Sequence, residues 1–297
     1  MVSQVARPQS DPTLRRRGAF RRLLSYPAAA FGLIVITAFF VMAALAPVLA
    51  PHDPTRGDLL QRLQPPAWAP RGEVSYFLGT DQLGRDVLSQ AIHGARVSLT
   101  VGLGVVAASG LIGGLLGLIA GFYRGTLDDV LARLADWTLA FPFIILAILL
   151  MGVLGPGIVN LIVVLSIAGW PHFFRLIRGE VLVEREKAYV EAAFALGKSP
   201  FVIMIGEIVR NIMHTFLVVA TIRLGIAILS EASLSYLGFG VPPDMPAWGT
   251  MVAYGQRYVE IAWWLSAVPG LAILSLVLSV NLVGEGLRDA LDPRLRE

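Results

Sequence analysis

The stretch VSLTVGLGVVAASGLIGGLLGLIAGFY, residues 97–123, contains no charged side chain. A helix of about 20 mostly apolar residues can cross the hydrocarbon core of a bilayer, where the backbone polar groups must satisfy one another because water is absent. This stretch is long enough and apolar enough to do so. It predicts a membrane-spanning helix, and with it an all-α integral membrane protein.

Small residues within the same stretch recur at four-residue intervals. Gly113, Gly117 and Gly121 form one such series, and Gly110 with Gly114 repeats the spacing beside it. Small residues at this interval let two helix backbones approach closely. We expect these glycines to pack the helix against another helix of the same bundle. An interface with a second subunit is the alternative.

The composition of the whole chain supports the membrane assignment. Of its 297 residues, 56% are apolar and 15% are charged, and the mean hydropathy is +0.69. Soluble domains carry about 25% charged residues. The absence of cysteine excludes a disulfide framework, a thiolate metal site and a cysteine nucleophile. The four histidines do not have metal-ligand spacing, so we predict no bound metal.

Further apolar stretches predict additional spans. Residues 137–174 are long enough for two spans, because LGPG at 154–157 is typical of a tight hairpin. The stretch 208–230 is apolar apart from Arg210, His214 and Arg223. The six predicted transmembrane helices are 23–51 and, within a five-helix core at 97–284, the segments 97–122, 137–154, 157–174, 208–230 and 262–284.

The basic residues predict the orientation of these spans. An even number of spans places both termini on one side of the membrane. Most of the 24 Lys and Arg residues lie in the N-terminal tail 1–22, the segment 124–136, the loop 175–207 with its continuation to Arg210, and the C-terminal tail 285–297. Cytoplasmic segments are enriched in Lys and Arg, so we expect both termini to be cytoplasmic.

The N-terminal region allows a second interpretation. The arginine-rich tail 1–22 is followed by an apolar stretch, which resembles a signal peptide. The apolar region of a signal peptide is about 7–15 residues long, much shorter than the stretch 23–51. We therefore favour an uncleaved anchor whose tail lies against anionic lipid headgroups.

The loop 52–96 is expected on the outer, periplasmic or extracellular, side of the membrane. Its first part is rich in proline and predicts irregular structure. Its second part, GTDQLGRDVLSQAIHGARVSL, offers Thr80 or Asp81 as a helix cap, followed by apolar residues at helical spacing. We expect a short amphipathic helix that leads into the second span.

The stretch EAAFALGKSP, residues 191–200, has a relaxed form of the spacing of a phosphate-binding loop. Such a loop follows a strand and opens a helix. Here residues 181–196 are rich in helix-forming residues, with Glu184 and Lys187 as an ion pair, and Gly197 lies where a helix would end. We therefore predict a helix over 181–196 and no nucleotide binding.

This predicted helix lies in the cytoplasmic loop between the fourth and fifth spans. The small side chains of Ala192 and Ala193 permit the close approach of a partner protein. A helix that only lies on the membrane surface is the alternative. Charged side chains at the rim would set the orientation of a partner: Arg185, Lys187, Glu191 and Lys198.

Aromatic residues are frequent in the outer segment before the last span. They are typical of an interfacial belt around a short helix. A surface that receives a partner protein is the alternative. The aromatic residues are Trp248, Tyr254, Tyr258, Trp263 and Trp264.

Three motifs together resemble a known family. EAAFALG in a cytoplasmic loop, LGTDQLGRDVLSQAIHGARVSL before the second span and EASLSYLGFGVPPDMPAWGTM at 231–251 are similar to segments of permease subunits of binding-protein-dependent ATP-binding-cassette importers. The similarity is to the dipeptide, oligopeptide and nickel type and extends from about residue 26 to 295. The chain departs from the family pattern at Gln90, at Val209 with Arg210, and at Arg223.

The resemblance implies a multi-pass protein of the bacterial inner membrane that forms half of a transport pathway. The implied partners are a second, homologous permease in a heterodimer, two ATPase subunits that use ATP and Mg²⁺, and an extracytoplasmic solute-binding protein. The chain itself would bind no cofactor or nucleic acid and would not be an enzyme. Di- and oligopeptides are the expected substrates, with nickel or another small solute as the alternative.

The resemblance also implies which residues transmit the action of the ATPases. The helix over 181–196 would move with them and shift the spans on either side. The implied coupling residues are Tyr189, Glu191, Ala192, Ala193, Gly197 and Lys198.

Arg223 is unusual because a charge near the middle of a span is costly unless it faces water or a partner. We expect it either to contact an anionic group, such as a substrate carboxylate, or to form an ion pair with Glu231 or with the partner permease. Asn211, Arg223 and Glu231 are our candidates for the transport pathway.

Two other functions predict different residues. An ion-coupled secondary transporter predicts acidic residues within the spans and a repeated half, and we find neither in the predicted spans. An intramembrane hydrolase predicts a nucleophile elbow, a pair of metal-binding histidines or carboxylates at membrane depth, and we find none of these.

Overall fold

The computed structural model describes residues 23–291. The predicted tail 1–22 and the end of the tail 285–297 lie outside this range. All regular structure within it is helical, apart from one isolated bridge between Thr80 and Asp86. The α-helices are α2 (Pro27–Ala44), α3 (Ala46–Leu49), α4 (Val87–Tyr123), α5 (Thr126–Ala140), α6 (Phe143–Leu154), α7 (Ile158–Arg185), α8 (Ala188–Ala195), α9 (Pro200–Val202), α10 (Val209–Tyr236), α11 (Trp248–Gly255) and α12 (Trp264–Leu291).

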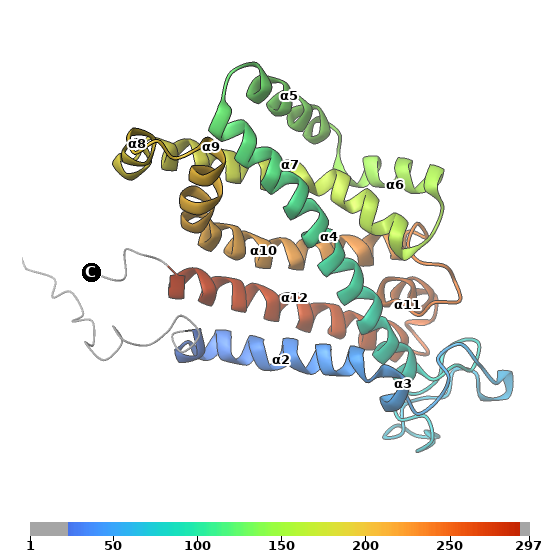
Figure 1. Cartoon of the computed structure of the whole chain (residues 1–297). Coiled ribbons are helices and arrows are strands. Elements are labelled where there is room, and N and C mark those ends of the chain that lie inside the picture. Colours follow the sequence, from blue (N-terminus) through green and yellow to red (C-terminus); the bar gives the residue numbers. More distant parts are fainter. Residues whose placement is uncertain (1–22, 292–297) are drawn as a thin grey trace, which may run out of the picture.

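The long helices form a bundle with two distinct ends (Figure 1). Helices α2, α10 and α12 lie side by side, and α4 crosses the bundle to pack along α7. Leu23 and Ala29 pack on Ala290, so the two ends of the described chain meet at one end of the bundle. Helix α8 lies toward this end, whereas α11 and the loop before α4 lie at the opposite end (Figure 1).

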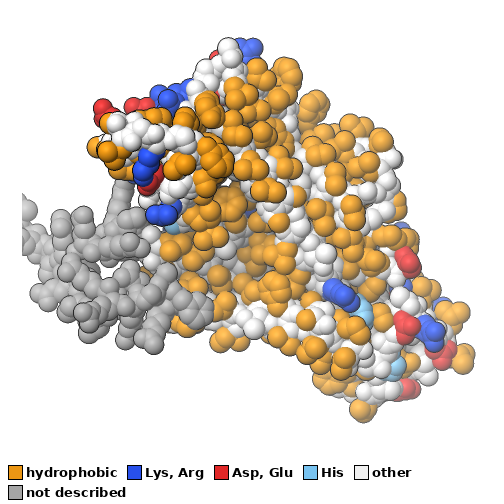
Figure 2. Space-filling view, in the orientation of Figure 1, with side chains coloured by type: hydrophobic (Ala, Val, Ile, Leu, Met, Phe, Trp, Pro, Cys, Tyr) orange, Lys and Arg blue, Asp and Glu red, His pale blue; other side chains and the backbone are white. Residues whose placement is uncertain are grey.

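Five helices are long and apolar enough to cross a membrane: α2, α4, α7, α12 and the continuous helix Pro200–Tyr236. Helices α5 and α6 meet this test only together, and they are bent by 90° at the break between them. Figure 2 shows hydrophobic side chains over the middle of one face, with charged side chains toward its ends. The chain is therefore an all-α membrane protein with five spans, or six when the bent pair counts as one.

The third span differs from the predicted helix 137–154. Its break falls at Phe141 and Pro142, because a residue before proline avoids the helical conformation and Phe141 is extended here. At the end of α4, Phe122 stacks on Phe194 of α8. After α6, the Gly157 N–H donates to the Gly240 carbonyl before α11, at 3.2 Å. The chain therefore enters the bent pair α5 and α6 near α8, at one end of the bundle, and leaves it near α11, at the other end.

The second span begins earlier than predicted. Helix α4 starts at Val87, capped by the Asp86 carboxylate, which accepts the Ser89 N–H at 2.9 Å. The expected amphipathic helix is the first part of α4 rather than a separate element. Asp81 is not the cap, because its carboxylate accepts the backbone N–H groups of Leu83 and Arg85 at 2.8 and 2.9 Å and so stabilises the turn before the helix.

The predicted glycine series lies against α7 of the same chain. A Cβ atom on Gly117 would lie 2.7 Å from the Phe174 carbonyl oxygen, and one on Gly121 would lie 2.9 Å from that of Arg178. At Gly113 a Cβ atom would lie 2.8 Å from the Phe173 Cβ and closer still to the α7 backbone. The two helices therefore approach too closely for a larger residue at these positions.

Candidate functional site

Helices α7, α8 and α10 meet in a corner at the end of the bundle where the described chain begins and ends (Figure 1). The expectation of one helix over 181–196 is wrong, because α7 ends at Arg185 and α8 begins at Ala188. The Glu184 carboxylate accepts hydrogen bonds from Lys187 and from the Tyr189 hydroxyl. These two bonds stabilise the turn, so α8 is a separate short helix.

Tyr189 connects α8 to both neighbouring helices. Its hydroxyl donates to Glu184 Oε2 on α7 at 2.6 Å and accepts from Asn211 Nδ2 on α10 at 3.0 Å. Burial and the bond to the Glu184 carboxylate raise the pKa of Tyr189 to about 12, so the phenol remains a neutral donor at physiological pH. Asn211, a candidate for the transport pathway, belongs to this network.

The two faces of α8 have different environments. Val190 and Ala193 are buried against a cluster that includes Ile203 and Ile208, so Ala193 faces the bundle. Glu191 and Ala192 are exposed on the other face. Of the predicted coupling residues on α8, these two are therefore exposed and able to contact another protein.

The stretch 191–200 ends one helix and begins the next. Gly197 has a φ of +74°, the Gly197 N–H donates to the Phe194 carbonyl, and the Lys198 N–H donates to the Ala193 carbonyl. This is a glycine helix terminus, as predicted. Ser199 then caps α9, and the stretch follows a helix instead of the strand that a phosphate-binding loop requires.

The fifth span is longer than the predicted 208–230. It runs from Pro200 through a π-helical segment, Ile203–Ile208, and ends at Tyr236. Lys198 is held at its start by an ion pair with Glu207, with 2.7 Å between Nζ and Oε1. Arg210 lies within this continuous helix, so the departure from the family pattern at this position does not interrupt it.

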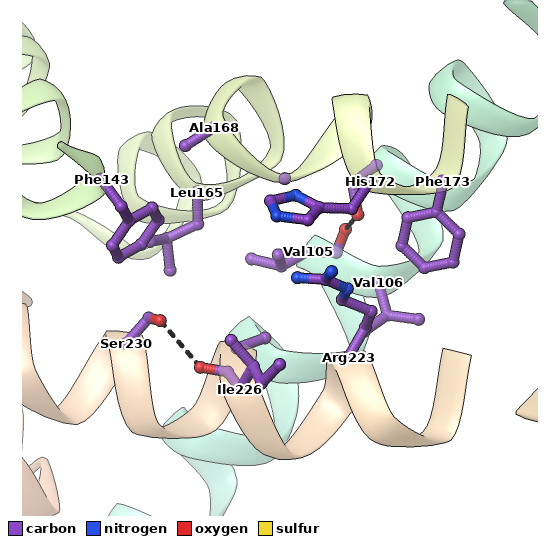
Figure 3. Close-up of a pocket in the computed structure, with 13 residues that line it drawn as sticks. Val105, Val106, Phe143, Leu165, Ala168, His172, Phe173, Arg223, Ile226 and Ser230 are labelled. Atoms are coloured by element: carbon purple, nitrogen blue, oxygen red, sulfur yellow. Dashed lines mark hydrogen bonds between the residues drawn. The ribbon is translucent and has the colours of Figure 1, made fainter. Parts of the chain in front are cut away.

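A cavity of about 230 Å³ lies between α4, α6, α7 and α10. Figure 3 shows Arg223 projecting from α10 toward His172 on α7, with apolar side chains around them. The hydroxyls of Ser109 and Ser230 donate to carbonyl groups of their own helices, at 2.5 and 2.8 Å. No acidic side chain lines the cavity. His172 was not singled out in the sequence, because its proximity to Arg223 depends on the packing of α7 on α10.

The expected ion pair between Arg223 and Glu231 is not formed. Glu231 is fully buried and accepts hydrogen bonds from Ser98 on α4 at 2.7 Å and from Ser235 at 2.8 Å. Because α10 continues to Tyr236, an acidic side chain does lie within a long apolar helix, contrary to expectation. Its two hydroxyl partners make Glu231 a link between α4 and α10, away from the cavity.

The prediction of an interfacial aromatic belt is wrong for two of its five residues. Trp248 is fully buried, and its Nε1–H donates to the Ala91 carbonyl at 2.9 Å. Trp264 is 4% exposed and donates to the Thr80 carbonyl at 3.2 Å. Trp248 therefore packs on the start of α4, and Trp264 is bonded to the loop that precedes it. Gly94 was the sequence signal for this contact, since a Cβ atom there would lie 2.5 Å from the Trp248 ring.

Within residues 23–291, no group of three or more His, Asp or Glu side chains is placed to hold a metal ion. The candidate sites of the described chain are the corner around α8 and the cavity at Arg223. The first has exposed side chains on a short helix, and the second has the guanidinium group of Arg223, unpaired among the described residues, inside an apolar bundle.

Comparisons with known proteins give consistent results over nearly the whole chain. The family described as the binding-protein-dependent transport system inner membrane component matches residues 113–297, and the N-terminal transmembrane domain of oligopeptide transport permease C matches residues 15–66. The chain is 41% identical to the di/tripeptide transport system permease protein DppC of Pseudomonas aeruginosa, over 97% of each chain. It is 40% identical to the dipeptide transport system permease protein DppC of Haemophilus influenzae, over 91% of each. It is 36% identical to the probable D,D-dipeptide transport system permease protein DdpC of Escherichia coli, over 98% of this chain and 96% of the relative.

Proposed function

Because this chain belongs to the inner membrane components of binding-protein-dependent transport systems, we propose that its bundle forms half of an ATP-driven import pathway for di- and oligopeptides. The chain is a multi-pass permease of the bacterial inner membrane. A second, homologous permease supplies the other half of the pathway, two ATPase subunits hydrolyse ATP, and a solute-binding protein delivers the peptide. The dipeptide relatives support peptides over nickel or another small solute.

The end of the bundle that carries α8 is the cytoplasmic end in this proposal. Basic side chains are concentrated there, among them Arg124, Arg175, Arg178 and Arg185. Cytoplasmic segments of membrane proteins are enriched in such residues. The loop before α4 and helix α11 then face outward, where the solute-binding protein arrives.

The observation that carries the proposed mechanism is the attachment of α8 to both α7 and α10. Tyr189 bonds to one residue on each helix, and Val190 and Ala193 anchor the inner face of α8. An ATPase subunit that contacts the exposed face of α8, at Glu191 and Ala192, would move α8 together with both spans. The cavity at Arg223 lies between these same two helices, so their relative movement would change its shape.

The test of this function is uptake by the whole complex. The four subunits are reconstituted in proteoliposomes with the solute-binding protein, and uptake of a labelled dipeptide is measured. We expect uptake to require ATP, to stop when the ATPase subunits are inactivated, and to be unaffected by ionophores that collapse proton and sodium gradients. Uptake that followed an ion gradient without ATP would instead establish a secondary transporter.

Replacing Tyr189 by Phe should weaken the coupling of ATP hydrolysis to transport. The change removes both hydrogen bonds that join α8 to α7 and α10 and leaves the aromatic ring in place. We expect peptide uptake per ATP hydrolysed to fall about fivefold to tenfold, which corresponds to about 1–1.5 kcal/mol. The measurement is the ratio of the uptake rate to the ATPase rate in proteoliposomes.

The control is Tyr123→Phe, which removes the hydroxyl of an exposed tyrosine at the end of α4. Its ratio of uptake to hydrolysis should match that of the unmodified protein. An unchanged ratio in Tyr189→Phe would show that the hydroxyl has no part in coupling.

A further inference from the structure

Arg223 occupies an environment that is unfavourable for an isolated charge. It lies within the long apolar helix Pro200–Tyr236 and lines the cavity between α7 and α10. Within residues 23–291 the Arg223 side chain has no ion pair or hydrogen bond. The Glu231 carboxylate, a possible partner, instead accepts hydrogen bonds from Ser98 and Ser235. A charged side chain within a span normally has a partner or a polar ligand. Arg223 therefore faces the cavity without a partner from the described residues.

From this geometry we propose that Arg223 and His172 form a subsite for the terminal carboxylate of a peptide in transit. The guanidinium group offers paired N–H donors in a plane, which matches the two oxygens of a carboxylate. His172 faces the same space from α7 (Figure 3), and its ring interacts with the Gly169 carbonyl of its own helix, which fixes it beside the guanidinium group. This inference rests on the proposed function, because it assumes that peptides pass along this bundle.

The other polar groups of the cavity make this assignment more specific. The Ser109 and Ser230 hydroxyl protons are used within their own helices, and the His172 ring interacts with the Gly169 carbonyl of α7, so the free N–H donors of the cavity come from Arg223. Without an acidic side chain in the lining, the site has no counterpart for a peptide ammonium group. The site therefore favours the carboxyl end of a peptide over its amino end.

The size and the walls of the cavity fit one end of a short peptide. Its volume, about 230 Å³, is below the range of about 300–1,000 Å³ that encloses a drug-sized ligand. Val105, Leu165 and Ile226 form an apolar lining that can accept the side chain next to the carboxylate. Ile226, which also lines the cavity, is 47% exposed. A membrane fatty acid carries the same carboxylate and is the other source to be distinguished.

The test compares a dipeptide that has a free carboxylate with the same dipeptide amidated at its C-terminus. Uptake of both is measured with the whole complex and saturating solute-binding protein, for the unmodified chain and for Arg223→Gln. The preference of the solute-binding protein is the same in both complexes, so it cancels when their acid-to-amide ratios are compared. We expect the ratio to fall about tenfold or more in Arg223→Gln, because the positive charge and the planar pair of N–H donors to the carboxylate are lost.

Two further variants and a control complete the experiment. Arg223→Lys keeps the charge without the planar pair of donors and should retain an intermediate ratio. His172→Gln keeps an N–H donor and should reduce the ratio less than Arg223→Gln does. Arg133→Gln changes the same charge on the exposed side of α5 and should leave the ratio unchanged. These variants keep the proposal testable if Arg223→Gln does not fold.

Two results would overturn the inference without affecting the proposed function. An equal loss of uptake for acid and amide in Arg223→Gln would make Arg223 a structural residue. An unchanged ratio, together with loss of a co-purifying fatty acid detected by mass spectrometry, would assign the carboxylate to lipid. Failure of the unmodified complex to import any peptide would instead contradict the proposed function.

Discussion

Replacing Glu191 by Arg is expected to abolish peptide uptake while the chain still inserts into the membrane. Glu191 lies on the exposed face of α8, and within residues 23–291 its side chain forms no ion pair that the substitution would break. The substitution places a positive charge where the partner surface is expected to receive a negative one. Repulsion of this kind costs several kcal/mol, so we expect uptake to fall about 100-fold or more. The measurement is ATP-dependent uptake in reconstituted proteoliposomes, beside the amount of the chain in the membrane.

The matched control is Asp129→Arg, which reverses another exposed carboxylate, on helix α5. It should reduce uptake little. Recovery of the ATPase subunits with the purified variant then separates failed assembly from failed transmission. Normal uptake by Glu191→Arg, with the ATPases bound, would show that this face of α8 is not the coupling surface.

Replacing Gly113 by Ala should destabilise the bundle, although it adds only one methyl group. The new Cβ would lie 2.8 Å from the Phe173 Cβ and even closer to the backbone of α7, which cannot move aside as a flexible side chain can. Overpacking of this kind costs about 1–3 kcal/mol and sometimes more. We expect a lower midpoint of thermal unfolding and less permease in the membrane.

The adjacent glycine provides the control. A Cβ atom on Gly114 would lie 3.7 Å from the Phe216 ring, which is an ordinary contact. Gly114→Ala should therefore keep the unfolding midpoint of the unmodified protein, and its better helix propensity favours the folded state. If the two variants had the same midpoint, α4 and α7 would not be packed as closely as the structure indicates.

The corner around α8 and the cavity at Arg223 are connected through the same two helices. Tyr189 is bonded to α7 and α10, and His172 and Arg223 lie on α7 and α10 further along the bundle. A change in the position of α8 would therefore alter the distance between His172 and Arg223, the two polar side chains of the proposed carboxylate subsite. In this way ATP binding at one end could regulate how tightly a peptide is held at the other.

The sequence by itself determined the features that depend on neighbouring residues. An uncharged apolar stretch such as 97–123 identifies a span, because its length and hydrophobicity alone make it stable in a bilayer. Gly197 identifies the end of a helix, because few other residues adopt its positive φ without strain. The four-residue glycine spacing likewise predicted a close helix contact.

Only the tertiary structure decided which distant residues meet. The Tyr189 hydroxyl, which bonds to Glu184 across the break between α7 and α8, also accepts a hydrogen bond from Asn211 on α10, 22 residues away. Trp248 was expected at the membrane interface, yet it is buried against Gly94. The Ser98 partner of Glu231 and the position of Arg223 beside His172 could not be predicted either, because they depend on which helix packs beside α10, and sequence spacing along one helix does not contain that information.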